Sequence, residues 1–184
     1  MTTGFGDSEA TVVMWRCLFT TGLERCVLID YENGAHGLEG TVLMSRDGEA
    51  LEIDYTINLD RNWRTVDAEV VIVGDESEVF NFEVDRNGRW TIETESGNDP
   101  QLLPEAELPI DLDLGFTPAT NLLPIRRLDL GIGDSEEITT VWLKYPDMRV
   151  QIAHQRYTRL GSDRYRYESP GFSAEITVDE MGLP

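Results

Sequence analysis

The sequence predicts a mainly β protein: a wide antiparallel meander of about eleven strands, curled into a barrel or half-barrel. Turn residues recur roughly every ten positions, as at Asn33-Gly34, Asp47-Gly48 and Asn87-Gly88, and this spacing is typical of a β meander. The stretches between the turns are rich in Val, Ile, Thr, Tyr and Trp and partly alternate between apolar and polar residues. A sheet this wide tends to curl or to close on itself.

Each predicted strand lies between two such turn signals. Alternation places the odd positions of 51–57 and the even positions of 80–84 on the interior face. Short connections make consecutive strands neighbours in the sheet. The strands expected, in chain order, are 11–19, 23–32, 37–45, 49–59, 63–73, 78–84, 89–95, 137–145, 149–159, 163–169 and 172–178.

The first hairpin contains the only two cysteines, Cys17 and Cys26. A turn at Thr21-Gly22 would place them directly opposite each other on neighbouring strands. Two interpretations are open: the two thiols meet, or they are two small apolar residues of a core in a reducing cytosol.

The pattern changes over residues 96–134, where five prolines occur and alternation disappears. We expect a crossover here, outside the meander. Thr117 could cap a short helix that begins at Pro118, because proline suits the first helical position, and Pro124 keeps that helix short or kinked. Since no flexible linker is evident, we expect one domain over residues 1–184, with a flexible stretch over its ten N-terminal residues.

The charge balance excludes one class of partner. Fifteen basic and 35 acidic residues give a net charge of −20, which repels nucleic acid and anionic membrane surfaces. Lys144 is the only lysine among the basic residues. Such a surface suits a halophile with a salt-rich cytoplasm, because salt screens the repulsion; a base composition that favours arginine is the alternative.

Targeting and membrane signals are missing from the sequence. The first ten residues include Asp7 and Glu9, with no basic residue and no apolar core of an export signal. No apolar run approaches the ~18 residues of a membrane helix. We therefore expect a cytoplasmic protein with no integral membrane segment, either a monomer or a homodimer.

Motifs of known catalytic chemistry are also missing. His36 and His154 have no second His or Cys at ligand spacing, and neither a Gly-x-Ser-x-Gly turn nor a nucleotide-binding glycine loop occurs. We expect no metal, no cofactor and no assigned catalytic residue. A hydrolase acting on glycoconjugates or lipids is the alternative, with Asp60, Asp111 or Glu168 as acid or base.

Two adjacent arginines, Arg126 and Arg127, lie in an apolar segment and need partners if either is buried. Asp111, Asp113 or Glu168 could serve. We predict that at least one of these arginines is half-buried and paired. Alternation points both aspartates to one face of a strand, either as an exposed strand edge or as a functional pair.

Two further segments combine charge with aromatic residues. Tyr55, Asp60, Trp63 and Arg64 flank a tight turn, and their pattern favours structural ion pairing, with ligand binding as the alternative. Residues 144–166 carry six basic side chains against two acidic ones. These basic groups either pair with carboxylates across the sheet or form a polar rim for an anionic or sugar headgroup.

Several of these residues, taken in order, resemble the putative glycolipid-binding family, formerly a domain of unknown function. The Pro-Ile-Arg-Arg-Leu element at 124–128 is its most specific part, and the resemblance runs from Trp15 to about Leu183. It implies a single antiparallel sheet wrapped around a cavity, similar to the half-barrels of bacterial lipoprotein and lipoglycan carriers. The matching residues are Trp15, Gly22-Leu23-Glu24, Tyr55-Thr56-Ile57, Asp60, Trp63-Arg64, Thr120-Asn121, Leu123 to Leu128, Val141-Trp142, Tyr145-Pro146, Gln155, Tyr157, Tyr165, Tyr167-Glu168-Ser169 and Phe172.

We therefore predict a non-enzymatic binding module that holds a lipid or glycolipid in an apolar cavity. A barrel of more than about eight strands is wider than its own side chains readily fill, and the tryptophans, Trp90 included, suit the wall of such a cavity. A structural or scaffolding domain without ligand is the second alternative. The residues expected to contact the ligand are Trp15, Tyr55, Trp63, Arg64, Arg126, Arg127, Trp142, Arg156, Tyr157, Tyr165 and Tyr167.

Overall fold

The computed structural model describes residues 8–46, 48–74, 77–95, 101–102 and 108–184. The protein is mainly β, as predicted, and divides into two compact units, Met1–Leu103 and Pro104–Pro184. The division falls inside the predicted crossover of residues 96–134. Whether the two units unfold together as one domain stays a prediction, and the expected flexible N-terminal stretch lies mostly outside the described residues.

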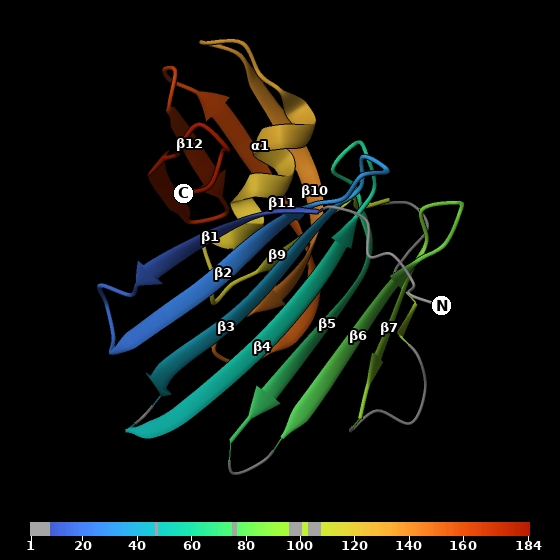
Figure 1. The fold of residues 1–184 in the computed structure, drawn as a ribbon, viewed down its shortest axis with the longest axis vertical. Helices are drawn as coiled ribbons and strands as arrows, with labels where there is room; N and C mark the ends of the chain where they lie inside the picture. The colour runs from blue at the N-terminus through green and yellow to red at the C-terminus, as the bar shows by residue number, and fades with distance from the viewer. Residues whose placement is uncertain (1–7, 47, 75–76, 96–100, 103–107) are drawn as a thin grey trace. The chain divides into compact units, whose positions relative to one another are not determined.

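The first unit is an eight-stranded antiparallel sheet in which the strands follow one another in chain order (Figure 1). Alternation decides which face each side chain occupies: Leu51, Ile53 and Ile57 are buried, and so are Phe80 and Phe82, as the sequence predicted. The strands are β1 (Glu9–Arg16), β2 (Gly22–Asp30), β3 (His36–Arg46), β4 (Glu49–Leu59), β5 (Thr65–Val73), β6 (Glu78–Val84), β7 (Trp90–Thr94) and β8 (Gln101–Leu102).

The first hairpin has a different register from the predicted one. Cys26 lies opposite Val13, and the backbone N–H of Cys17 bonds to the carbonyl of Gly22 at 3.0 Å. The prediction that the cysteines face each other was therefore wrong, because residues 17–21 form a longer turn than Thr21-Gly22 alone. Cys17 is exposed, Cys26 is buried and both are free thiols.

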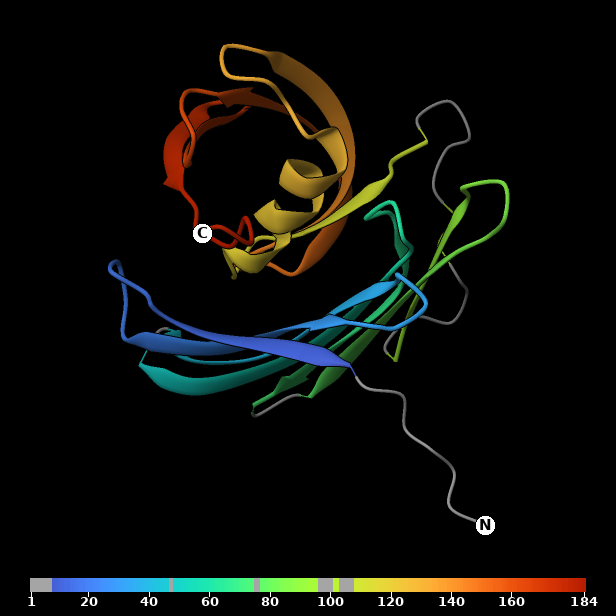
Figure 2. The ribbon, with the colours of Figure 1, turned by 45° about the horizontal axis from the view of Figure 1, so that its top comes forward.

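The second unit is a five-stranded sheet that curls around one short helix (Figure 2). Its strand order is β13-β12-β11-β10-β9, antiparallel except for the parallel pair β9 and β10. The inner face packs on the helix through a cluster that includes Ile125, Ile138 and Tyr165. The elements are β9 (Asp111–Leu114), the 3₁₀ turn Ala119–Asn121, α1 (Leu122–Leu128), β10 (Ser135–Lys144), β11 (Arg149–Arg159), β12 (Arg164–Ser169) and β13 (Phe172–Thr177).

The 3₁₀ turn begins one residue after the predicted helix start at Pro118, and α1 begins three residues later. The Thr117 hydroxyl accepts a hydrogen bond from the backbone N–H of Ala119 at 2.9 Å, and the 3₁₀ turn then leads into α1. Pro124 fits because it lies in the first turn of α1, where a backbone N–H has no partner within the helix. The helix ends at Asp129, which has left-handed backbone angles.

All eleven predicted strands are present, as β1–β7 and β10–β13. They differ from the prediction in forming two sheets instead of one continuous path, since β1–β7 belong to the first sheet and β10–β13 to the second. Two short strands within that segment, β8 and β9, were not predicted. Among the described residues, no helix has the length and apolarity needed to span a membrane.

Candidate functional site

The second sheet has a gap along one side of β11. This strand pairs with β10 from Arg149 to Thr158, but with β12 only from Arg156 to Arg159. Over residues 149–155, the side of β11 that faces β12 therefore has no ladder partner among the described strands. The gap opens into the space between the inner face of the sheet and the start of α1.

A cavity of about 760 Å³ occupies this space. One wall is apolar or aromatic and comes from β10, β11 and β13: Trp142, Ile152, Ala153, Phe172, Ala174 and Ile176. The other lining groups are hydrogen-bonding or charged and come mainly from β9, β11 and the segment before the helix, among them Asp113, Thr117, Asn121, Gln151, His154 and Gln155. The cavity thus has an apolar side and a polar side.

A buried carboxylate organises the polar side. Gln155 Nε2 donates to Asp113 Oδ2 at 2.5 Å, and the Thr120 hydroxyl lies 3.4 Å from Asp113 Oδ1. The same hydroxyl accepts from the backbone N–H of Leu114 at 3.3 Å. Burial raises the pKa of Asp113 to about 6, although the hydrogen bonds from Gln155 and Thr120 oppose that shift. Asp113 therefore keeps its proton to a higher pH than an ordinary aspartate does.

Tyrosines surround Asp113 and connect the polar side to the apolar wall. The Tyr157 hydroxyl donates to Asn121 Oδ1 at 2.8 Å, and its ring meets Tyr167 edge-on at 5.4 Å. Tyr167 in turn lies 6.0 Å from the ring of Phe172. Burial, and then the nearby Asp113 carboxylate, raise the pKa of Tyr157 well above 10 and that of Tyr167 to about 12. Both tyrosines therefore stay protonated and can donate hydrogen bonds.

Behind this cluster lies a buried ion pair. Arg127 Nε and Nη2 bind Asp111 Oδ1 and Oδ2 at 3.0 and 2.5 Å, and the two side chains are 15% and 1% exposed. The predicted partly buried, paired arginine is confirmed. The alternative of an exposed strand edge was wrong for Asp111: although β9 lies at the edge of its sheet, it turns both aspartates inward to Arg127 and Gln155.

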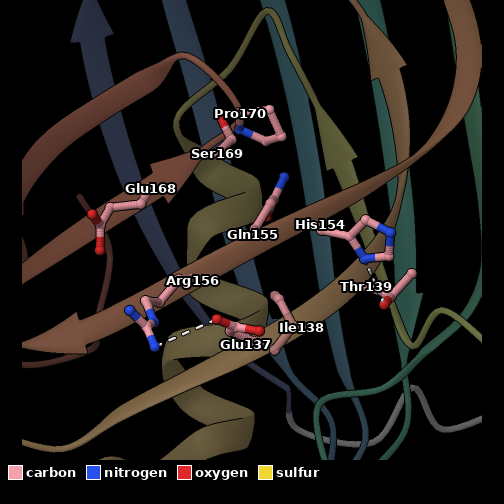
Figure 3. Close-up of a pocket in the computed structure, with 9 residues that line it drawn as sticks. All are labelled: Glu137, Ile138, Thr139, His154, Gln155, Arg156, Glu168, Ser169 and Pro170. Carbon is pink, nitrogen blue, oxygen red and sulfur yellow. Dashed lines mark hydrogen bonds and ion pairs between the residues drawn. The ribbon is translucent and has the colours of Figure 1, made fainter.

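A smaller pocket of about 430 Å³ adjoins the cavity and shares His154, Gln155, Ser169 and Pro170 with it (Figure 3). Figure 3 shows Arg156 directed toward Glu137, at 3.4 Å, and His154 toward Thr139, at 3.3 Å. These side chains form a polar rim beside the gap in the sheet.

The structure brings some of the predicted ligand residues of the second unit to this cavity. Trp142 and Tyr167 line it, Tyr157 packs against Tyr167, and Arg156 lies on the rim. Three others lie elsewhere in the unit. Arg127 is held by Asp111, Arg126 is exposed on α1, and Tyr165 belongs to the core with Arg159 stacked 5.6 Å from its ring.

The four predicted ligand residues of the first unit do not form one cluster. Tyr55 is buried and donates to Glu24 Oε1 at 2.6 Å, and the half-buried Trp15 of β1 lies opposite Glu24 on the neighbouring strand. Trp63 stacks on His36 with 3.8 Å between ring centres. Arg64 is exposed, and its backbone N–H bonds to Asp60 Oδ1. Their part in binding stays a prediction.

Each of the three carboxylates that were expected as acid or base of a hydrolase occupies a different place in the structure. Asp111 is enclosed and held by Arg127. Asp60 caps a turn of the first unit by accepting from the backbone N–H groups of Asn62 and Arg64. Glu168 lies opposite Arg156 on β11, on the outer face of the second sheet, whereas Asp113 faces inward. Within the second unit, these side chains do not form an acid pair over one cleft.

Sequence reasoning missed the central position of Asp113 and Gln155. Asp113 was considered as an arginine partner, yet Arg127 binds Asp111. The alternation of Asp111-Leu112-Asp113-Leu114 was the available signal, because it gives a strand with two aspartates on one face. Four of the six basic residues of 144–166 pair with acids of their own unit, such as Arg156 with Glu137 and Arg164 with Glu175 at 3.9 Å. Arg159 instead donates to backbone carbonyls.

Comparisons with known proteins agree on one family. Residues 12–184 match the family described as "Putative glycolipid-binding". The chain is also similar to a DUF1089 family protein from Pseudomonas aeruginosa, whose crystal structure was solved at 1.80 Å resolution. The two are 27% identical and superpose with a TM-score of 0.72, over 92% of this chain and 89% of the other. No curated protein matches the sequence significantly.

Proposed function

Because the chain belongs to the putative glycolipid-binding family, we propose that the cavity of its second unit binds a lipid or glycolipid without chemical conversion. One observation carries the proposal: the cavity of about 760 Å³ combines an apolar, aromatic wall with the polar side that Asp113 organises. Ligand sites in proteins are commonly ~300–1,000 Å³ and combine apolar lining with a few directed polar groups.

The apolar wall suits a hydrocarbon chain. Ile152, Phe172 and Ile176 offer aliphatic and aromatic surface, and the gap beside β11 provides the entrance. Each methylene group removed from water contributes about 0.8 kcal/mol. Affinity should therefore rise with chain length until the apolar part of the cavity is full.

The polar side of the cavity suits a sugar headgroup. Asp113 can accept hydrogen bonds from ligand hydroxyl groups, and the Gln155 and Asn121 amides can exchange their present partners for them. A carboxylate on the polar side repels an anionic headgroup at neutral pH and lowers its affinity. A hydroxyl-rich, uncharged headgroup therefore fits beside Asp113, while the basic groups are Lys144 elsewhere in the lining and Arg156 on the polar rim.

Binding of alkyl glucosides of graded chain length tests the proposal. We expect the emission of Trp142 to change on binding, and the affinity to increase with each added methylene. Ala174→Phe, on the wall, should abolish binding by filling the cavity. Ser173→Phe places the same ring on the exposed neighbouring residue of β13 and is the matched control.

Two outcomes would contradict the proposal. Equal affinity for short and long alkyl glucosides would show that the apolar wall is not used. Retained binding by Ala174→Phe would place the ligand elsewhere.

A further inference from the structure

Beyond the cavity, the first unit presents an apolar surface at the end of its sheet. The turn between β1 and β2 stands out at the margin of the sheet (Figure 2), and in it Phe19 is 100% and Leu18 78% exposed. Three exposed apolar side chains of the adjoining strands continue this surface: Met14, Leu23 and Leu43. We call these five residues the apolar tip.

The register places the strand residues of the tip on one face. Leu23 of β2 lies opposite Arg16 of β1 and Leu43 of β3. Met14 is two residues from Arg16 on the same strand, so it has the same orientation. The three side chains therefore line the same outer face, next to the turn.

Hydrogen bonds hold the turn in place. The backbone N–H of Cys17 bonds to the Gly22 carbonyl at 3.0 Å, and the N–H of Ser45 bonds to the Thr21 carbonyl at 2.9 Å. The Thr20 hydroxyl donates to the Ser45 carbonyl at 3.1 Å. Leu18 and Phe19 are thus displayed by a turn that is anchored on both sides, and their exposure does not depend on a loose segment.

The local charge differs from that of the rest of the chain. The protein carries −20, yet residues 10–23 contain Arg16 and no acidic residue. Arg25 lies opposite Met14 and is exposed, whereas the neighbouring Glu24 is buried and accepts from Tyr55. The tip therefore has a basic border on β1 and β2, whereas on β4 the exposed Glu52 lies opposite Leu43.

We propose that the apolar tip docks on a zwitterionic lipid surface. Leu18 and Phe19 would enter the boundary between headgroups and acyl chains, while Arg16 and Arg25 meet the phosphate groups of the lipid. The charge pattern favours this partner, because a zwitterionic headgroup offers a phosphate to the two arginines and an ammonium group to Glu52. The acidic remainder of the chain opposes a strongly anionic membrane.

Flotation with phosphatidylcholine vesicles tests the proposal. We expect the unmodified protein to float with the vesicles and Leu18→Ser/Phe19→Ser to lose at least about tenfold in partition coefficient, because two large apolar side chains no longer leave water. Ile132→Ser removes an equally apolar residue that is 68% exposed in the second unit, and should change nothing. Since all three positions are exposed, these variants should fold.

A second measurement locates the contact. Phe19→Trp keeps the apolar character of the tip, and its emission should shift to shorter wavelength on vesicles and be quenched by brominated phosphatidylcholine. Ala174→Phe should lose glucoside binding but keep flotation, which separates this proposal from that for the cavity.

Three results would overturn docking through the tip: no flotation, equal flotation of the double variant, or an unquenched Trp at position 19. A double variant that only turns a dimer into a monomer would identify a second copy as the partner.

Discussion

The buried pair of Arg127 and Asp111 gives a sharp test of how the second unit is held together. Arg127→Met keeps much of the volume of the side chain but removes both hydrogen bonds to a carboxylate that is 1% exposed. A hydrogen bond to a charged group contributes about 1.5–3 kcal/mol. Breaking a buried pair from one side costs about 3–5 kcal/mol, because the remaining buried charge loses its counter-ion. We expect a loss of that size in the free energy of unfolding.

Urea denaturation followed by circular dichroism measures this loss, and the neighbouring residue provides the control. Arg126→Met changes the adjacent, exposed side chain of the same helix and should cost less than about 1 kcal/mol. Adding Asp111→Leu to Arg127→Met should restore much of the stability, because an apolar pair of similar volume often replaces a buried ion pair without loss. If Arg127→Met and Arg126→Met unfold at the same urea concentration, the reasoning is refuted.

Three further outcomes are expected. The pKa of Asp113 is raised to about 6, against an ordinary value of 3.8, so the folded protein binds this proton more tightly than the unfolded chain does. The stability that the protonated carboxyl group contributes is present below about pH 4 and is lost as the pH rises to about 6. The expected loss in the free energy of unfolding is roughly 3 kcal/mol. Asp113→Asn should remove that slope, and equal pH profiles of the two proteins would contradict the burial argument. Gly40→Ala should destabilise the first unit by about 1–3 kcal/mol, since the added Cβ would lie 2.2 Å from the Tyr55 ring, whereas Gly74→Ala meets nothing closer than 3.5 Å; similar unfolding midpoints for both would show that the ring moves aside. Finally, the thermal midpoint should rise from low to molar potassium chloride, because counterions relieve the repulsion within a chain of −20; a midpoint independent of salt would remove the argument for a saline cytoplasm.

The strands could be predicted because the signals for each strand lie in its own residues and in the turns beside it. Val79 to Val84 alternate between inward and outward side chains, and turn residues bound them on both sides. The pairing register of two strands is harder to predict than the position of each strand. The Cys17–Cys26 prediction failed because the length of a turn shifts the pairing of the whole hairpin, and nothing in residues 17–22 signals the longer turn that forms.

The site was harder to predict because it depends on pairings between distant segments. Strand β9 has four residues and gains its place by parallel pairing with β10, about thirty residues later in the chain. The cavity depends on where β12 stops pairing with β11, at Arg156. The alternation of apolar and polar residues signals neither the pairing of β9 with β10 nor the point where β12 stops pairing with β11. The sequence therefore pointed to Trp142 and Tyr167 as residues that contact the ligand, but not to the meeting of Asp113 with Gln155.

Native mass spectrometry of freshly purified protein tests the central claim most directly, because it detects any ligand that the cavity retains. The account predicts an added mass that matches a lipid or glycolipid, present in the unmodified protein and in Ser173→Phe but lost in Ala174→Phe. The same adduct on Ala174→Phe, or an unmodified protein that carries no lipid and takes up no alkyl glucoside when supplied, would contradict the claim that this cavity is a lipid-binding site.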